Sequence, residues 1–229
     1  TRYVLGFRKT DSLLTFLEAV GPDALDGDTV ARYRYSDAQG VGALQQPRRI
    51  TLDRRGVTTL DLRVTEIAFG PDATTDADFA VPAGFAERPV AKTEVRKVAE
   101  RLYEIGGIGG GLYRTYFIDA DEGVIVFDAP LGYAVGQQIV RLIQGALPGK
   151  SIARVVISHF HSDHAAGVQA FVDAGAEVVA ATSLRPVLER YAKATSALAP
   201  ARPGAPRPFR FKGVDRDQLR VGSSGGTAI

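Results

Sequence analysis

All three histidines of the chain lie within six residues, directly after an apolar run of strand length. Residues 152–158 are nearly all apolar, which is typical of a strand buried on both faces. His159, His161, Asp163 and His164 follow at once and precede an apolar segment of helical length. Histidines on an ordinary surface would not gather at the end of a core strand. The order therefore predicts an α and β domain with a functional site at this strand end.

The spacing of these four side chains indicates metal binding. In an extended segment residues i and i+2 point the same way, so His159 and His161 can bind one ion. Asp163 and His164 come where the chain turns into the helix and can face a second ion. Imidazole nitrogen and carboxylate oxygen suit zinc, and also iron, manganese or nickel. Two ions about 3.5–4 Å apart would deprotonate a bridging water and polarise a carbonyl or phosphoryl group.

Composition restricts the partners more than the chemistry. The 229 residues suffice for two domains, and a net charge of +2 gives no reason to expect nucleic acid or an anionic membrane. There is no cysteine, so neither disulfides nor thiolate ligands exist. No apolar run approaches the ~18 residues of a membrane span. The expected partner is a small-molecule substrate, and the oligomeric state is left open.

The chain is expected to hold two domains. Residues 1–85 predict a small antiparallel β-rich domain, residues 86–94 a linker, and residues 95–229 the metal-binding domain. In the first domain we expect a short helix over residues 11–21, closed by Gly21, followed by strands at 29–36, 49–53 and 58–69.

Strands and helices are expected to alternate in the second domain. The patterns predict a strand over 98–105, a hairpin of 113–119 with 124–128, a helix around 139–146, a helix over 165–174, a strand over 177–181 and a helix over 183–197. The proline-rich residues 199–208 predict a loop, and glycines between positions 106 and 111 a flexible loop beside the site.

The motif and its surroundings resemble the metallo-β-lactamase superfamily. The histidines and aspartate are followed by Ala165-Ala166-Gly167, and the preceding hairpin ends in Phe127-Asp128-Ala129-Pro130, a strand end typical of members. The resemblance covers roughly residues 95–185. It implies an α+β fold, here a partial αββα sandwich with metals at one edge, and a glycine loop that closes over substrate.

The resemblance also implies roles for individual residues. His159 and His161 would bind the first metal, and Asp163 and His164 the second. Asp163 would be catalytic as well, because it would orient the attacking water. Asp128 would fix a ligand or the motif loop; the alternative is an aspartate that makes only turn hydrogen bonds.

One departure from the family pattern changes the expectation for this chain. Members take a further histidine, a bridging aspartate and a last histidine from later segments, whereas no histidine follows His164. The chain also lacks methionine and ends within strand-like sequence, which predicts a C-terminally truncated piece of a longer protein. We expect two zinc ions in the full-length protein, with iron or manganese compatible, and weak metal binding and little activity in residues 1–229.

Three functions fit these observations. The first is hydrolysis of an ester, thioester, lactam, lactone or phosphoester by a metal-bound hydroxide. The second is a mononuclear iron oxidoreductase of the sulfur dioxygenase type, and the third a vestigial, non-catalytic metal-binding module. Gln46-Pro47-Arg48-Arg49-Ile50 and the alternating strand resemble lipoprotein-carrier domains that precede some bacterial members. This favours a periplasmic or secreted protein, with a cytoplasmic location also compatible.

Overall fold

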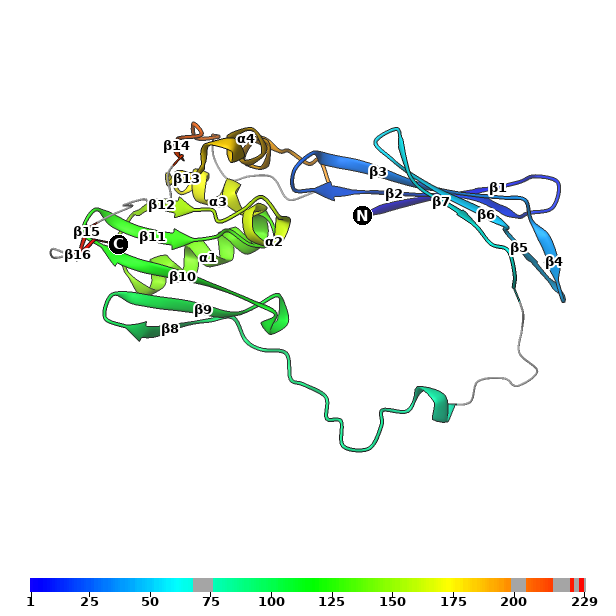
Figure 1. The fold of residues 1–229 in the computed structure, drawn as a ribbon, viewed down its shortest axis with the longest axis horizontal. Coiled ribbons are helices and arrows are strands. Elements are labelled where there is room, and N and C mark those ends of the chain that lie inside the picture. The colour runs from blue at the N-terminus through cyan, green and yellow to red at the C-terminus, as the bar shows by residue number, and fades with distance from the viewer. Residues whose placement is uncertain (68–75, 199–204, 216–222, 225–226, 229) are drawn as a thin grey trace. The chain divides into compact units, whose positions relative to one another are not determined.

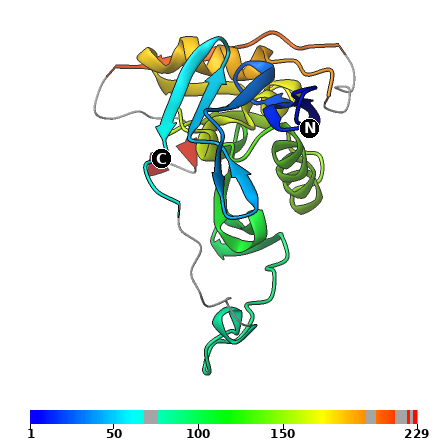
Figure 2. The same cartoon turned by 90° about the vertical axis from the view of Figure 1, so that its right-hand side faces the viewer.

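The structure, a computed structural model, describes residues 1–67, 76–198, 205–215, 223–224 and 227–228. Its chain divides into two compact units, drawn in Figures 1 and 2. The first holds Thr1–Pro22, Asp28–Arg88 and Ser196–Ala199, and the second holds Asp23–Gly27, Pro89–Thr195 and Pro200–Ile229. Among the described residues, no helix is both long and apolar enough to cross a membrane.

The first unit is built on a five-stranded sheet. The strands stand in the order β1-β2-β3-β6-β7, and the pairs β1–β2, β3–β6 and β6–β7 are antiparallel. A short hairpin of β4 and β5 follows β3, and a 3₁₀ turn lies at Asp76–Phe79. The strand bounds are Arg2–Phe7 (β1), Leu14–Asp23 (β2), Gly27–Ser36 (β3), Gln39–Val41 (β4), Leu44–Gln46 (β5), Arg49–Arg54 (β6) and Val57–Arg63 (β7).

The predicted helix over residues 11–21 is wrong, because this segment is strand β2. Asp11 and Ser12, expected to cap a helix, form a hairpin turn in which Asp11 Oδ1 accepts the Leu13 N–H at 3.2 Å and Ser12 has φ 59°. Leu17 then pairs with Leu5 of β1, which satisfies the backbone. Apolar residues on both sides of a half-buried strand also match helical spacing, so periodicity could not separate the two structures.

The second unit contains a seven-stranded mixed sheet in the order β14-β13-β12-β11-β10-β9-β8. Strands β8 to β11 pair antiparallel, and β11 to β14 pair parallel. Their bounds are Glu94–Ala99 (β8), Leu102–Ile108 (β9), Tyr113–Ala120 (β10), Gly123–Phe127 (β11), Ile152–Val156 (β12), Glu177–Ala181 (β13) and Phe211–Val214 (β14), with two-residue strands at Ser223–Ser224 (β15) and Thr227–Ala228 (β16).

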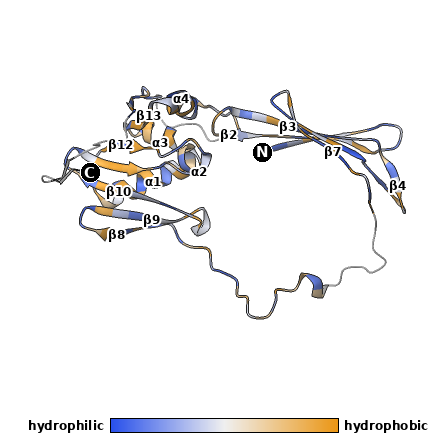
Figure 3. Ribbon diagram, in the orientation of Figure 1, coloured by the Kyte–Doolittle hydropathy of each residue, from blue (hydrophilic) through white to orange (hydrophobic). Residues whose placement is uncertain are grey.

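The helices of this unit pack against one face of the sheet. They are α1 (Tyr133–Ala146), α2 (Ser162–Ala165), α3 (Val168–Asp173) and α4 (Arg185–Lys193), the last preceded by a 3₁₀ turn at Thr182–Leu184. Ile139, Phe171 and Leu188 from three helices are fully buried against Val126 and Val155 of the sheet. Figure 3 shows this apolar layer in orange. The α+β class and the partial metallo-β-lactamase-like sheet expected above are confirmed.

Two element predictions for this unit need correction. The single strand expected over 98–105 is a hairpin of β8 and β9, which turns at Arg101 with φ 61°. The helix expected over 165–174 is interrupted at Gly167, between α2 and α3, where the chain lies against the Ala129 carbonyl. The hairpin of β10 and β11 and the strand over 177–181 are confirmed. Residues 199–204 of the predicted loop lie outside the described residues.

Helix α1 packs closely against the chain behind the motif at Gly136. A Cβ at this position would lie 2.7 Å from the Gly167 carbonyl oxygen and 2.8 Å from the Ala170 methyl carbon. We therefore expect Gly136→Ala to lower the free energy of unfolding by about 1–3 kcal/mol through overpacking. Denaturant unfolding measures the change.

Gly145 of the same helix provides the matched control, because a Cβ there meets nothing within 4 Å. Gly145→Ala should raise the free energy of unfolding slightly, by up to about 1 kcal/mol, from helix propensity alone. Equal effects of the two substitutions would contradict the close contact at Gly136.

Candidate metal-binding site

The four motif residues follow the carboxyl end of β12, and Asp128 follows the carboxyl end of its parallel neighbour β11. This edge is the usual position of binding sites in such sheets. The segment between β11 and α1 (residues 128–132) is called the corner here. Backbone hydrogen bonds join it to the loop after β12. Asp128 N–H donates to the Val156 carbonyl at 2.8 Å, and Ala129 N–H to the His164 carbonyl at 2.7 Å. The segment Phe127–Pro130, which the sequence indicated as the end of the hairpin, is therefore held in place next to the motif.

Helix α2 begins within the motif and ends after one turn. His161 is its extended N-cap residue, and its carbonyl accepts the N–H groups of His164 and Ala165. The chain then passes beneath the corner at Gly167, whose N–H donates to the Ala129 carbonyl at 2.7 Å. A Cβ at Gly167 would lie 3.0 Å from that same oxygen, so a glycine fits here and the helix is interrupted.

The Asp128 carboxylate binds three groups of the motif segment. Its Oδ1 accepts the Ser158 N–H at 2.8 Å, and its Oδ2 accepts the Ser158 hydroxyl at 3.0 Å. Oδ2 also lies 2.8 Å from His164 Nδ1. Asp128 has φ 62°, a left-handed conformation that is costly for a non-glycine residue. The predicted contact between Asp128 and the motif is confirmed, and its role in metal binding stays a prediction.

These hydrogen bonds set the tautomers of two histidines. An ionised carboxylate only accepts, so Nδ1 of His164 carries the proton in its bond with Asp128. The single Ser158 hydroxyl proton also goes to Asp128, so the Ser158 oxygen accepts from His159 Nδ1, 3.0 Å away. In a neutral imidazole of this tautomer the lone pair lies on Nε2, which is the form that binds metals.

The structure brings all four motif side chains together. The ring centroid of His159 lies 4.8 Å from that of His161 and 4.1 Å from that of His164. Asp163 Oδ2 lies 3.6 Å from His164 Nε2. The side chains of Asp163 and His164 are 37% and 35% exposed, so a ligand can reach them. Within the described parts of the chain, however, no three histidine or carboxylate side chains are arranged to hold one ion.

The four side chains are of the types that bind metal ions, but they are too few to complete two metal sites. Three imidazoles and a carboxylate are the ligands that zinc prefers, and the tautomers and exposure also suit binding. A catalytic zinc usually has three protein ligands, whereas two ions sharing these four residues would have two each. The assignment of His159 with His161 and of Asp163 with His164 to separate ions stays a prediction.

Tyr191 of α4 supports the motif from below and was not anticipated from the sequence. Its hydroxyl donates to the Phe160 carbonyl at 3.2 Å, between the first two histidines, and the side chain is buried. Burial raises the pKa of Tyr191, and the negative charges of Asp23 and Asp26 raise it further. The hydroxyl therefore remains a neutral donor at physiological pH.

The glycine cluster lies next to the corner. Gly109–Gly111 form a 3₁₀ turn between β9 and β10, with φ 59°, 74° and 97°. A Cβ at Gly109 would lie 3.0 Å from the Leu131 side chain, so the turn packs directly on the corner beside Asp128. Gly106 and Gly107, expected in the same loop, belong to β9 instead. The turn at Gly109–Gly111 lies next to the corner, and its closure over a substrate stays a prediction.

Comparison with solved structures finds a sec-alkylsulfatase and two metallo-β-lactamases at low similarity. A sec-alkylsulfatase, Pisa1 from Pseudomonas sp., is 25% identical over 42% of this chain and 16% of its own, with a TM-score of 0.35. Metallo-β-lactamases from Hirschia baltica and Pontibacter korlensis are 22% and 19% identical, with TM-scores of 0.37 and 0.38. They match 44% and 45% of this chain. The matched region spans 48% and 50% of those two proteins, so this chain covers half of their length at most.

No curated protein matches the chain. The family model described as "Metallo-beta-lactamase superfamily" matches residues 108–226, just over half of the chain, and includes the corner and the motif. The chain thus belongs to the metallo-β-lactamase superfamily.

Proposed function

We propose that the motif binds divalent metal, with zinc the best fit, and serves hydrolysis of an ester, thioester, lactam, lactone or phosphoester. His159, His161, Asp163 and His164 would hold the metal. A bound metal lowers the pKa of a water and polarises the oxygen of the bond to be broken. Family membership supports a metallo-hydrolase type of protein.

The observation that carries the proposal is the Asp128 network. It orients two imidazoles through hydrogen bonds at Nδ1, which leaves Nε2 as the nitrogen that would bind metal. Asp163 lies beside His164 and is half-exposed, so its carboxylate can accept a proton from a water held between the side chains. The exposed Phe160 and the glycine turn at 109–111 border the site and are candidates to contact substrate.

The first test is zinc affinity of the chain, measured by competition with a chromogenic chelator. We expect weak but measurable binding, because the described residues supply only part of a coordination sphere. His161→Ala should weaken binding at least tenfold, since it removes one of the few ligands. His161 is exposed, so its removal should leave folding intact.

Ser162→Ala is the matched control, because Ser162 is the exposed next residue, at the start of α2, and is not one of the four proposed ligands. Absence of zinc binding by the parent chain, or equal affinity of both variants, would refute the proposal. Turnover of a substrate panel with added zinc, manganese or Fe(II) then tests the reaction. Iron-dependent oxygen consumption without hydrolysis would contradict the hydrolase and support the oxidoreductase.

Asp128→Asn tests the tautomer argument. An amide NH₂ at Oδ2 would favour a His164 tautomer that accepts at Nδ1 and carries its proton on Nε2, which cannot bind metal. We expect zinc affinity to fall about 10–100-fold, the usual cost of losing such a supporting group. Chelator competition measures the fall, and NMR of the imidazole nitrogens reports the tautomer.

Asp119→Asn provides the comparison for this variant. Asp119 lies on the adjacent strand β10 and pairs with Lys150 at 2.6 Å, so it loses the same charge away from the motif. If Asp119→Asn weakened zinc binding as much as Asp128→Asn, general electrostatics would explain the loss instead of the tautomer.

Tyr191→Phe tests the support beneath the motif. It removes one hydrogen bond of about 0.5–1.5 kcal/mol, so zinc affinity should fall roughly two- to tenfold. Tyr116→Phe, which loses a hydroxyl bond to Glu104 at 3.1 Å, should leave zinc affinity unchanged. Thermal unfolding of both variants separates the local effect from lost stability; unchanged affinity in Tyr191→Phe would show that Phe160 needs no such anchor.

A further inference from the structure

The tip of the β2–β3 hairpin (residues 23–27) belongs to the second unit, although the strands that it joins form part of the sheet of the first. Ala24 and Leu25 of the tip pack against the main hydrophobic core, which lies between the second sheet and its helices. The tip is therefore a structural part of the unit that carries the motif.

The backbone of the tip is held in a turn by Asp23. Its carboxylate accepts the N–H groups of Leu25 and Asp26, at 2.9 Å and 3.0 Å. Aspartate commonly stabilises a turn in this way, through bonds to the backbone two or three residues ahead. The turn fixes the direction in which Leu25 and Asp26 leave the backbone.

The tip contacts the end of α4 at two points. Asp26 forms an ion pair with Arg190, and the Asp26 side chain is only 15% exposed. Gly27 is buried, and a Cβ at this position would lie 2.2 Å from the Thr195 carbonyl oxygen. Gly27 also has φ 75°, a conformation that favours glycine. A side chain at position 27 would thus push the tip away from the segment that ends α4.

Gln169 of α3 holds the same end of α4. Its side chain is buried, and its Nε2 donates to the Ala192 carbonyl at 3.1 Å and to the Ala194 carbonyl at 2.7 Å. Carbonyls in the last turn of a helix have no partner within the helix, so an outside donor is needed. The end of α4 is therefore fixed by α3 as well as by the tip.

Tyr191 lies inside this fixed stretch, directly after Arg190. Its hydroxyl donates to the Phe160 carbonyl at 3.2 Å, between two of the motif histidines. The ring is 6% exposed, so close packing restricts its movement relative to the helix. Whether the hydroxyl meets the Phe160 carbonyl therefore depends on where α4 ends.

We propose that the tip is a positioning element of the metal site, in which Asp26 and Gly27 hold the end of α4 so that Tyr191 supports the motif. This inference rests on the metal binding proposed above and adds residues 23–27 to the elements that determine zinc affinity. They act through α4 and are not among the proposed ligands. Because coupling between two sites is reciprocal, zinc at the motif should also stabilise the tip.

The first test is the zinc affinity of Arg190→Gln in the whole chain, measured by chelator competition. Loss of the contact with Asp26 should weaken zinc binding about two- to fivefold, the range expected for a partly exposed ion pair. Electrostatics alone predicts the opposite sign, because removal of a positive charge favours the binding of a cation. Unchanged or tighter zinc binding would overturn the proposal.

Gly27→Ala tests the close approach to Thr195. The methyl group would displace the tip, and we expect zinc affinity to fall about tenfold. Gly56→Ala is the matched control, because Gly56 has a similar φ of 79° but a Cβ there meets nothing within 4 Å. Circular dichroism checks that both variants are folded. Equal zinc affinity of the two folded variants would contradict a role for the tip.

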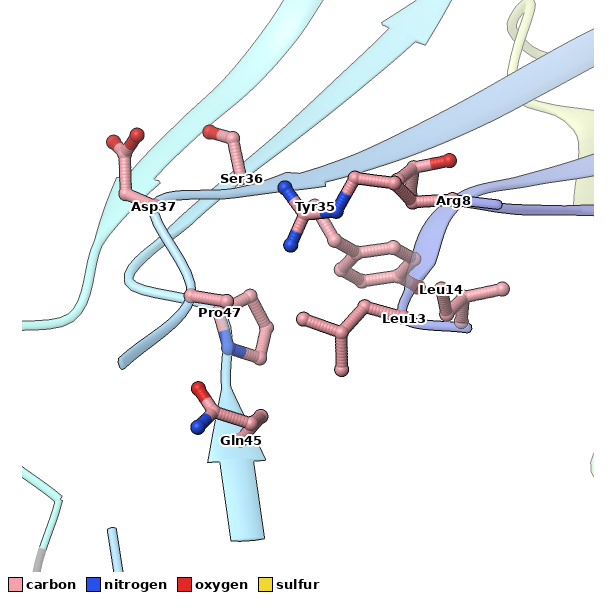
Figure 4. Close-up of a pocket in the computed structure, with 10 residues that line it drawn as sticks. Arg8, Leu13, Leu14, Tyr35, Ser36, Asp37, Gln45 and Pro47 are labelled. Carbon is pink, nitrogen blue, oxygen red and sulfur yellow. The ribbon is translucent and has the colours of Figure 1, made fainter. Parts of the chain in front are cut away.

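Ser36→Ala controls for changes elsewhere in the same hairpin. Ser36 is the last residue of β3, at the end of the strand opposite the tip, where it lines a cavity of the first unit with Leu14 and Tyr35 (Figure 4). We expect the zinc affinity of the parent chain. A loss as large as that of Arg190→Gln would show that the metal site responds to any change in the hairpin, which would refute the specific role of the tip.

A double-mutant cycle tests the route through Tyr191. Arg190→Gln should weaken zinc binding in the parent chain and have little further effect in Tyr191→Phe, because both substitutions interrupt the same series of contacts. Fully additive losses would contradict this route. Thermal unfolding of the four proteins shows whether the losses in affinity follow lost stability instead.

Hydrogen exchange measures the reciprocal effect, which a merely structural role of the tip would not produce. Zinc should slow exchange of the Leu25 and Asp26 amides in the parent chain and leave the amide of Gly56 unchanged. Unchanged exchange at the tip with zinc bound would refute the coupling. If the parent chain bound no zinc, the proposed function would fail together with this inference. If His161→Ala weakened zinc binding while Arg190→Gln did not, only the role of the tip would be wrong.

Discussion

The Asp128 carboxylate is the interaction on which the motif depends. It joins the end of β11 to the loop after β12 and, through Ser158 and His164, sets two imidazoles in one orientation. Without it, each histidine would be free to rotate and to exchange tautomers, and metal binding would have to supply that ordering energy. Preorganisation of ligands therefore begins in a strand corner that precedes the motif by about thirty residues.

The strain of that corner is supported by the packing around it. Asp128 and Leu131 both have φ near 62°, which costs of order 1–3 kcal/mol for each residue. Backbone bonds from Ala129 to His164 and from Gly167 to Ala129 fix the corner on the α2–α3 segment. Gly136 lets α1 close on Gly167 from the other side. The small residues Ala129, Gly136 and Gly167 thus help to shape the site, although they have no side-chain group that could bind a metal.

The sequence predicted what is local and missed what depends on tertiary contact. Continuous apolar runs identified β12 and β13, and the spacing of the histidines identified the cluster, because both are contained within a few residues. Tyr191 could not be found, since it reaches the motif through a tertiary contact with Phe160, which lies 31 residues away in the chain. Strand β2 was mistaken for a helix because a strand half-buried on both sides has no clear alternation.

The two units are stabilised by different means, and this bears on what the first unit requires. The second buries a continuous layer of side chains from the sheet and three helices, whereas Leu52 is the one buried apolar side chain among the described residues of the first sheet. Exposed ion pairs of that sheet contribute about 0–1 kcal/mol each and cannot replace that burial. The first unit therefore rests on less apolar burial than the second.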